Sequence, residues 1–215
     1  EWIYAADGSS IEIPLRHDRM PVEEMYPFLE GQTLGEFYDN FMHSSASILL
    51  LIGPPGSGKT TFIRGLLQHS EASAIVSYDS NVLEKDYVFA NFIEGEKNVL
   101  VLEDADMFLK ARSEGNTMMH KFLNVGDGLV TTRNKKLIFS TNLPSIRDID
   151  SALIRPGRCY DILHFEELSQ EQAEKLATKV GTKLNRERES WSIADVFFEQ
   201  NTNTKKTIER KMGFV

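Results

Sequence analysis

One eight-residue run carries the clearest chemistry in this chain: residues 53–60 read Gly-Pro-Pro-Gly-Ser-Gly-Lys-Thr. The run matches the phosphate-binding pattern G-x-x-x-x-G-K-[ST] at every fixed position. Its glycines let the backbone bring N–H groups close to a polyphosphate, and the N-terminus of the following helix adds to the anion site. We expect Lys59 to reach the β- and γ-phosphates and the Thr60 hydroxyl to bind Mg²⁺. The predicted nucleotide-binding residues are Gly53, Pro54, Pro55, Gly56, Ser57, Gly58, Lys59, Thr60 and Thr61.

The segments on either side of this loop are those that the motif requires. Residues 47–52 form a short apolar run that suits a buried strand. Residues 60–68 place Phe62, Ile63, Leu66 and Leu67 at helical spacing. At ordinary residue usage, a chance match is expected about once in a hundred chains of this length. The strand before the loop and the helix after it make chance rarer still, so the chain is predicted to bind a nucleotide.

A second group of polar residues follows another apolar run, at residues 98–102. Glu103 and Asp104 come directly after it, and Asp106 lies two residues further on. A phosphate loop needs carboxylates from a second strand to hold Mg²⁺ and to act on the attacking water. Two adjacent acids can point in different directions, one to the metal and one to the γ-phosphate. For Asp106, capping of a helix N-terminus is the favoured interpretation.

Three further residues are candidates for the reaction. Asn142 ends the next strand, where its side-chain amide could orient a water, although Asn is also common in turns before Leu-Pro. Arg155 and Arg158 flank Pro156 and Gly157. Arginines of this kind can stabilise charge on a γ-phosphate, and a neighbouring subunit can supply them. Taken alone, the two arginines would be interpreted as surface residues in salt bridges.

The central part of the chain alternates strand and helix patterns. Strands are expected at residues 47–52, 74–77, 98–102, 136–140 and 162–165, with helical patterns at about 83–94, 116–125 and 148–154. This alternation is typical of an α/β fold with a central parallel sheet. Residues 46–165 are therefore predicted to form the nucleotide-binding core.

The two ends of the chain differ from this core. Residues 1–45 are predicted to pack on the core or lead into it, with a short strand pair around residues 7–8 and a helix at 34–41. After residue 165 only helical patterns remain. Ser169 with Gln172 forms a capping-box signature, and Ser192 with Asp195 marks the start of another helix. Residues 166–215 are therefore predicted to form a small helical lid.

Composition limits the classes of function. The 215 residues carry a net charge of −8, which disfavours nucleic acid as the main partner. Cys159 is the single cysteine, which fits a reducing intracellular compartment, cytoplasmic by default. No apolar stretch is long enough to span a membrane. The chain begins at Glu1, so a targeting segment or a further domain could precede it.

Together these motifs resemble an AAA+ ATPase. The resemblance rests on their order: GPPGSGKT, VLVLEDAD, FSTN and SALIRPGR, followed by a helical tail. It covers residues 46–165 closely and 166–215 loosely. Within the family the chain most resembles the mitochondrial Rieske-protein translocase group, which assists cytochrome bc complex assembly. The supporting runs are LEDAD at 102–106, KFLNVGDG at 121–128 and ALIRPGR at 152–158.

The resemblance implies a P-loop NTPase core that binds ATP with Mg²⁺. It places Thr60 and Glu103 at the metal, Asp104 at the attacking water and Asn142 as the sensor. Arg155 and Arg158 would be arginine fingers that act on a neighbouring subunit. It further implies a homo-oligomeric ring, a hexamer or heptamer, that remodels or translocates a macromolecule. A protein substrate is favoured over nucleic acid, and the resemblance implies association with the mitochondrial inner membrane if a segment precedes Glu1.

The chain departs from the usual AAA+ pattern in three places. Most members have Asp and then Glu at the acidic pair, whereas this chain has Glu103 and then Asp104, and Asp is one methylene shorter. No lid arginine stands at the expected sensor position. The region 78–85 lacks the aromatic-hydrophobic-Gly triplet of many unfoldases, which disfavours threading by aromatic residues, although Val82 and Leu83 could line a pore.

Two alternatives to a ring ATPase stay open at this point. The order of the acidic pair suggests a nucleotide-gated assembly protein that binds ATP and hydrolyses little of it. The second alternative is a DNA-linked AAA+ protein, such as a helicase loader or replication factor. The acidic core argues against a DNA-linked role.

Overall fold

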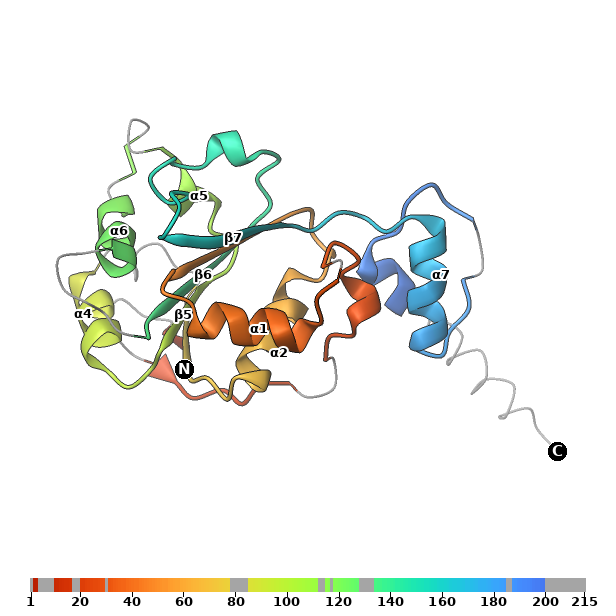
Figure 1. The fold of residues 1–215 in the computed structure, drawn as a ribbon, viewed down its shortest axis with the longest axis horizontal. Coiled ribbons are helices and arrows are strands. Elements are labelled where there is room, and N and C mark those ends of the chain that lie inside the picture. Colours follow the sequence, from red (N-terminus) through yellow and green to blue (C-terminus); the bar gives the residue numbers. More distant parts are fainter. Residues whose placement is uncertain are drawn as a thin grey trace.

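A seven-stranded sheet forms the centre of the molecule (Figure 1). The computed structural model describes residues 2–3, 10–16, 20–29, 31–77, 85–111, 115–116, 118–127, 134–184 and 187–199. The strands are β1 (Trp2–Ile3), β2 (Ser10–Ile11), β3 (Ile48–Ile52), β4 (Ala74–Ser77), β5 (Val99–Leu102), β6 (Lys136–Thr141) and β7 (Cys159–His164). Their order in the sheet is β2-β1-β4-β5-β6-β3-β7.

The five strands predicted for the core are all present and run parallel. Strand β3 pairs with β6 on one side and with β7 on the other, and β5 pairs with both β4 and β6. The prediction of an α/β fold with a parallel sheet is therefore confirmed. From β3 the chain crosses to β4, whereas from neighbouring β6 it crosses to β7 on the opposite side. The carboxyl ends of β3 and β6 thus flank a topological switch point, where ligands bind in such sheets.

Helices cover both faces of the sheet because successive strand residues point to opposite sides. On one face Leu49 and Leu51 pack against α1 (Leu34–His43) and α2 (Lys59–His69). On the other face Ile48 and Leu50 pack with the short helices α4 (Asp86–Glu94), α5 (Asp106–Leu109) and α6 (Met119–Asp127). Every residue of β3 is buried, so the strand before the phosphate loop is held firmly on both sides.

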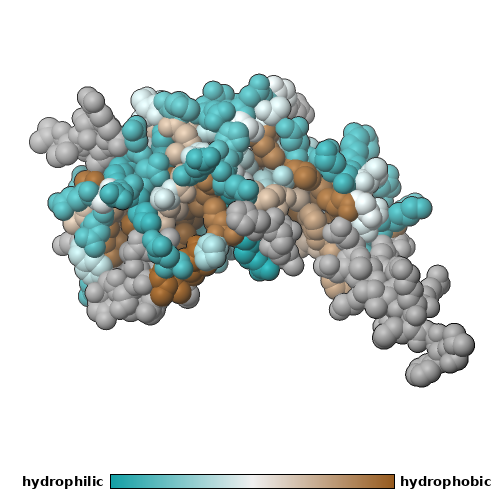
Figure 2. Space-filling view, turned by 90° about the horizontal axis from the view of Figure 1, so that it is seen from below, coloured by the Kyte–Doolittle hydropathy of each residue, from teal (hydrophilic) through white to brown (hydrophobic). Residues whose placement is uncertain are grey.

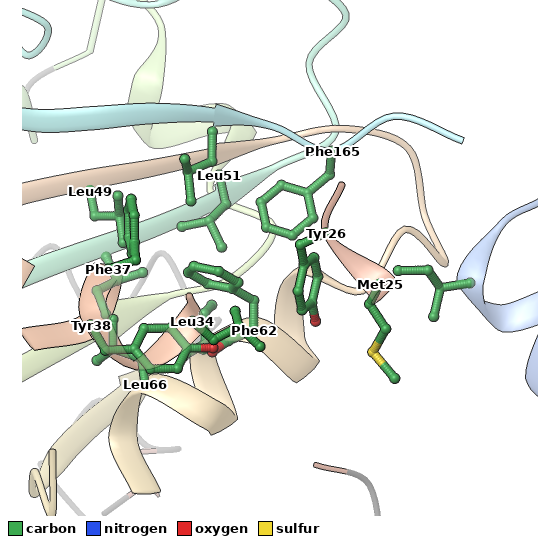
Figure 3. Packing of buried hydrophobic residues seen from close by; sticks show 14 of the residues in the cluster. Met25, Tyr26, Leu34, Phe37, Tyr38, Leu49, Leu51, Phe62, Leu66 and Phe165 are labelled. Carbon is green, nitrogen blue, oxygen red and sulfur yellow. The ribbon is translucent and has the colours of Figure 1, made fainter. Parts of the chain in front are cut away.

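The N-terminal residues are tied to this core. The predicted strand pair is present as β1 and β2, which are antiparallel, and Trp2 pairs with Val76 of β4; the turn at residues 7–8 lies outside the described residues. A 3-10 turn, η1 (Glu23–Met25), leads to Tyr26. Figure 3 shows the Tyr26 ring beside Phe62 and Phe165 under the sheet. The centre of the Tyr26 ring lies 5.2 Å from that of Phe62 and 5.7 Å from that of Phe165, and both pairs are edge to face.

The predicted helical pattern at 148–154 is wrong. The structure has a 3-10 turn, η3 (Ile146–Asp148), followed by irregular turns. The Asp150 carboxylate accepts the Ala152 N–H at 2.9 Å, and the Asp150 N–H donates to Leu109 O at 2.8 Å. A side chain that bonds the backbone locally competes with helix formation.

After β7 the chain leaves the sheet and forms a C-terminal helical segment, which we define as described residues 166–184 and 187–199. Its helices are α7 (Gln170–Lys179) and helical residues 193–199. Both predicted capping signatures are present: Ser169 and Gln172 form a complete box, and the Ser192 hydroxyl accepts the Asp195 N–H at 3.1 Å. Figure 1 shows α7 at the end of the molecule opposite α4 and α6.

The surface is mixed. Figure 2 shows a face on which hydrophilic residues predominate and hydrophobic residues gather in separate areas. Exposed large hydrophobic side chains include Ile11, Ile13, Ile93, Met107 and Phe198. Within the described ranges, no helix has both the length and the apolar character needed to cross a bilayer.

Candidate nucleotide-binding site

The phosphate loop lies at the carboxyl end of β3, where its glycines are required by geometry. Gly58 has φ 92°, in the left-handed region that disfavours residues with a side chain, and directly precedes α2. A Cβ atom on Gly53 would lie 2.2 Å from the Phe165 carbonyl oxygen. No side chain caps the N-terminus of α2. Its first N–H groups are therefore arranged to receive an anion.

Lys59 is buried, and its ammonium group lies among oxygen acceptors. Its Nζ donates to Gly53 O at 2.6 Å, to Pro54 O at 2.9 Å and to Asn142 Oδ1 at 2.9 Å. Burial lowers the pKa of Lys59 from its usual value of 10.5, while the negative charges of Asp104, Asp106 and Glu103 act in the opposite direction. The Lys59 amino group thus lies at the loop, where a phosphate would be held.

The acidic pair follows β5 as predicted, and its two members point to different partners. Glu103 Oε1 accepts a hydrogen bond from the Thr60 hydroxyl at 2.5 Å. Two oxygen atoms that could bind a metal ion therefore meet, although they come from distant parts of the chain. Asp104 is exposed and has φ 50°. This left-handed conformation costs most residues about 1–2 kcal/mol, although Asp is one of the few residues besides glycine that visit it. Such strain is often found at functional positions.

Asn142 links the lysine to the second acid. Its Oδ1 accepts from Lys59 Nζ, and its Nδ2 donates to Asp104 Oδ1 at 3.0 Å. The orientation of the amide is determined by chemistry, because a lysine ammonium can only donate and a carboxylate can only accept. Side chains from β3–α2, β5 and β6 are therefore joined in one hydrogen-bonded cluster at the switch point.

Asp106 lies in the first turn of α5, as its interpretation as an acid at a helix N-terminus predicts, but its side chain does not cap the helix. Ala105 is the N-cap of α5 and makes no side-chain cap bond. The Asp106 carboxylate instead accepts the Thr141 hydroxyl and the Asn142 N–H, the latter at 3.1 Å. It thereby holds the end of β6, because a buried strand end leaves donors that need partners.

A cleft of about 750 Å³ lies over this cluster. Its described lining includes Lys59, Thr60, Glu103, Asp104 and Asn142. The C-terminal helical segment forms another wall, and there Ala194 N–H donates to Gly56 O at 3.1 Å. Sequence reasoning missed the apolar lining residues, which are Met20, Met25, Ile193, Ala194, Phe197 and Phe198. The Ser192 capping signal could locate the helix but not the loop that it contacts.

The two arginines lie at the other end of the sheet. The Arg158 carbonyl accepts from Ser47 N and Ile48 N at 3.1 and 3.0 Å, beside the amino end of β3. From Ile48 to Gly53 the strand advances by about 16 Å, at roughly 3.3 Å per residue. Arg155 is exposed, whereas the Arg158 guanidinium bonds Ala152 O within its own loop. The structure therefore does not bring either arginine to the phosphate loop of the same chain.

Two sequence features cannot be placed completely. Residues 78–84 of the predicted pore region lie outside the described residues, as does Gly128 of the run at 121–128.

A second hollow, of about 880 Å³, lies between residues 12–16 and α2. It shares Thr60 and Glu103 with the cleft, but its lining includes apolar Ile63 and Leu67 and lacks Lys59, Asp104 and Asn142. The smaller cleft is thus the one where the polar cluster meets.

Comparisons with known proteins agree with this geometry. Residues 49–167 match the model of the ATPase family associated with various cellular activities (AAA). The chain is 30% identical over 140 residues to 26S proteasome regulatory subunit 8 of Caenorhabditis elegans, covering 57% of this chain and 33% of that protein. It is 26% identical over 185 residues to the probable mitochondrial chaperone bcs1 of Schizosaccharomyces pombe, covering 80% of this chain and 39% of that protein.

The chain spans between a third and two fifths of the length of these curated relatives. The mitochondrial chaperone supports the predicted resemblance to the mitochondrial translocase group. The family match covers more than half of the chain and includes the phosphate loop, the acidic pair, Asn142 and both arginines. The chain therefore belongs to the AAA family of ATPases.

Proposed function

We propose that this chain binds and hydrolyses ATP with Mg²⁺, as a subunit of a homo-oligomeric ring that remodels a protein partner. One observation carries the proposal: Lys59, Asn142 and Asp104 form a continuous hydrogen-bonded chain in a cleft that Thr60 and Glu103 also line. These side chains come from three separate strand ends. Their convergence beside the N-terminus of a helix suits a nucleoside triphosphate.

In this proposal Lys59 and the loop from Gly53 to Thr61 hold the phosphates. Thr60 and Glu103 fit Mg²⁺, because this ion takes one or two protein oxygens together with phosphates and water. When bound, the ion neutralises charge that develops on the phosphate oxygens. Asp104 polarises the attacking water, and Asn142 senses the γ-phosphate from its position between Lys59 and Asp104.

The ring is proposed because the arginines cannot serve the site of their own subunit. About 16 Å of strand separates their loop from the phosphate loop. Arg155 is exposed and is the better candidate for the finger that reaches a neighbour's nucleotide. Arg158, through its bond to Ala152 O, would brace the loop that presents Arg155. The resemblance favours six or seven subunits, and the net charge of −8 favours a protein partner over nucleic acid.

The test compares two substitutions in the assembled protein. Asp104→Asn should still bind ATP but lower kcat by about 10²–10⁴-fold, the usual contribution of an acid–base group. Lys59→Ala should lose ATP binding itself. Asp148→Asn, at an exposed position of η3, serves as the control and should behave as the wild type. Hydrolysis at the normal rate by Asp104→Asn would refute the assignment of Asp104.

Subunit mixing tests the arginine. Arg155→Ala subunits have an intact phosphate site, and Asp104→Asn subunits have an intact finger. If Arg155 acts on the neighbour, mixtures should regain part of the activity that each variant lacks alone. A failure of every mixing ratio to restore activity would count against action between subunits.

A nucleotide-gated assembly protein is the second candidate. The short side chain of Asp104 favours slow hydrolysis, because it reaches less far toward the attacking water than a Glu side chain would. Turnover far slower than once per minute in the assembled ring, together with ATP-dependent oligomerisation, would select this function. A DNA-linked role predicts DNA binding that weakens as salt is raised, and an absence of DNA binding at any salt concentration would remove it.

A further inference from the structure

Asp106 lies close to the reaction site but is not among the described residues that line the cleft. The turn that carries it is fixed to the neighbouring strand, since Ala105 N–H donates to Ser140 O at 2.8 Å. Ala105 is completely buried, and Asp106 is half-buried. The Asp106 carboxylate is therefore held at a set position beside the end of β6.

Its contacts lock the backbone that leads into Asn142. The Thr141 hydroxyl donates to Asp106 Oδ1 and accepts the Leu143 N–H at 3.1 Å. The Asn142 N–H donates to the same carboxylate oxygen at 3.1 Å. Three consecutive residues are thus ordered directly or indirectly by one carboxylate. Charged acceptors form the stronger hydrogen bonds, so this oxygen suits the task.

The side chain of Asn142 depends on that backbone. Its amide must meet Lys59 Nζ at 2.9 Å and Asp104 Oδ1 at 3.0 Å at the same time. A rotation or shift of the Asn142 backbone would break at least one of these contacts, because the amide group is short and rigid. Asp106 therefore determines how accurately the Asn142 side chain is placed between Lys59 and Asp104.

We propose that Asp106 is a positioning residue for ATP hydrolysis, acting through Asn142 without contacting the nucleotide. This inference rests on the ATPase function proposed above. A misplacement of about 1 Å in a reacting group can lower a rate by about a hundredfold. Loss of Asp106 should accordingly reduce kcat much more than it changes ATP affinity, because Lys59 and the phosphate loop stay in place.

The experiment is a double-mutant cycle in the full chain. Asp106→Ala should lower kcat by about tenfold to a hundredfold, with a much smaller change in affinity for a fluorescent ATP analogue. Asp106→Asn keeps an acceptor oxygen for both donors and should recover part of the rate. If Asp106 acts through Asn142, Asp106→Ala combined with Asn142→Ala should be no slower than Asn142→Ala alone. Asp148→Asn is the matched control, a substitution of an exposed acid in a one-turn helix.

Three results would overturn the inference: a normal kcat in Asp106→Ala, a change confined to ATP affinity, or fully additive effects in the double variant. If Asp106→Ala fails to fold, the same cycle is run with Asp106→Asn. A wild-type protein that binds ATP without hydrolysing it would refute the ATPase proposal instead. In that case the positioning of Asn142 is tested by NMR of its side-chain amide, whose resonance is identified by its loss in Asn142→Ser. This resonance should shift in Asp106→Asn. An unshifted resonance would exclude positioning of Asn142 by Asp106.

Discussion

Lys136 provides a quantitative test of how the core is assembled. It is 2% exposed at the start of β6, and its Nζ donates to Ser44 O at 2.9 Å and to Ala46 O at 2.8 Å. The ammonium also lies 4.9 Å from the centre of the Phe41 ring. This one cation therefore joins the end of α1 to the sheet. Substitution by Met removes the charge and shortens the unbranched side chain by one atom.

Burial lowers the pKa of Lys136 from 10.5 to about 8. Between these two values the unfolded chain binds more protons at this site than the folded chain, so stability contributed by the site rises with pH. Each unit between the two pKa values corresponds to about 1.4 kcal/mol. Carbonyl partners and residual hydration reduce the full effect. We therefore expect a gain of about 1–3 kcal/mol in the free energy of unfolding from pH 8 to pH 10.5.

Urea unfolding at several pH values measures this effect. From pH 8 to pH 10.5 the free energy of unfolding of the wild type should rise by about 1–3 kcal/mol relative to that of Lys136→Met. Below pH 7 the difference between the two proteins should stay constant. Lys175→Met, at an exposed position of α7, is the control and should show no such change. A pH-independent difference between wild type and Lys136→Met would refute the reasoning.

Three smaller predictions concern the frame of the site. Gly53→Ala places a Cβ atom 2.2 Å from Phe165 O and should destabilise the fold by about 1–3 kcal/mol in thermal unfolding. Tyr26→Phe removes the hydroxyl bond of 3.1 Å to Gly58 O and should cost about 0.5–1.5 kcal/mol, measured by urea unfolding. Ser169→Ala removes the N-cap of α7 and should cost about 0.5–2 kcal/mol, with unchanged stability counting against the observed cap.

The fold and the polar centre of the cleft could be predicted because their signals are local. A buried parallel strand is a short apolar run, and the residues at its carboxyl end follow it directly in sequence. The phosphate loop and Glu103 were located in this way, and the structure places them at one edge of the sheet. The reaction roles of these residues stay predictions until the variants are measured.

Other features depend on contacts between distant segments, which a single sequence does not reveal. Asp106 has the local pattern of a helix cap, yet its carboxylate bonds residues 35 and 36 positions away. Ile193 and Phe197 line the cleft only because their helix docks on the phosphate loop. The turns at 148–154 contain apolar spacing, but Asp150 is held by Leu109 of α5. In each case a tertiary contact outweighs the local preference.

The pairing of β3 with β7 has a mechanical consequence. At one end of this ladder Phe165 N–H donates to Ile52 O at 2.7 Å beside the phosphate loop, and at the other end Arg158 O holds the start of β3. These paired strands, whose register shifts once between Ile48 and Leu49, connect the place where this chain would hold its nucleotide with the loop that carries Arg155. In the ring proposed above, a small tilt of the strand pair at one nucleotide site would displace an arginine at the adjacent site. The hydrogen bonds of the sheet would then couple neighbouring sites directly.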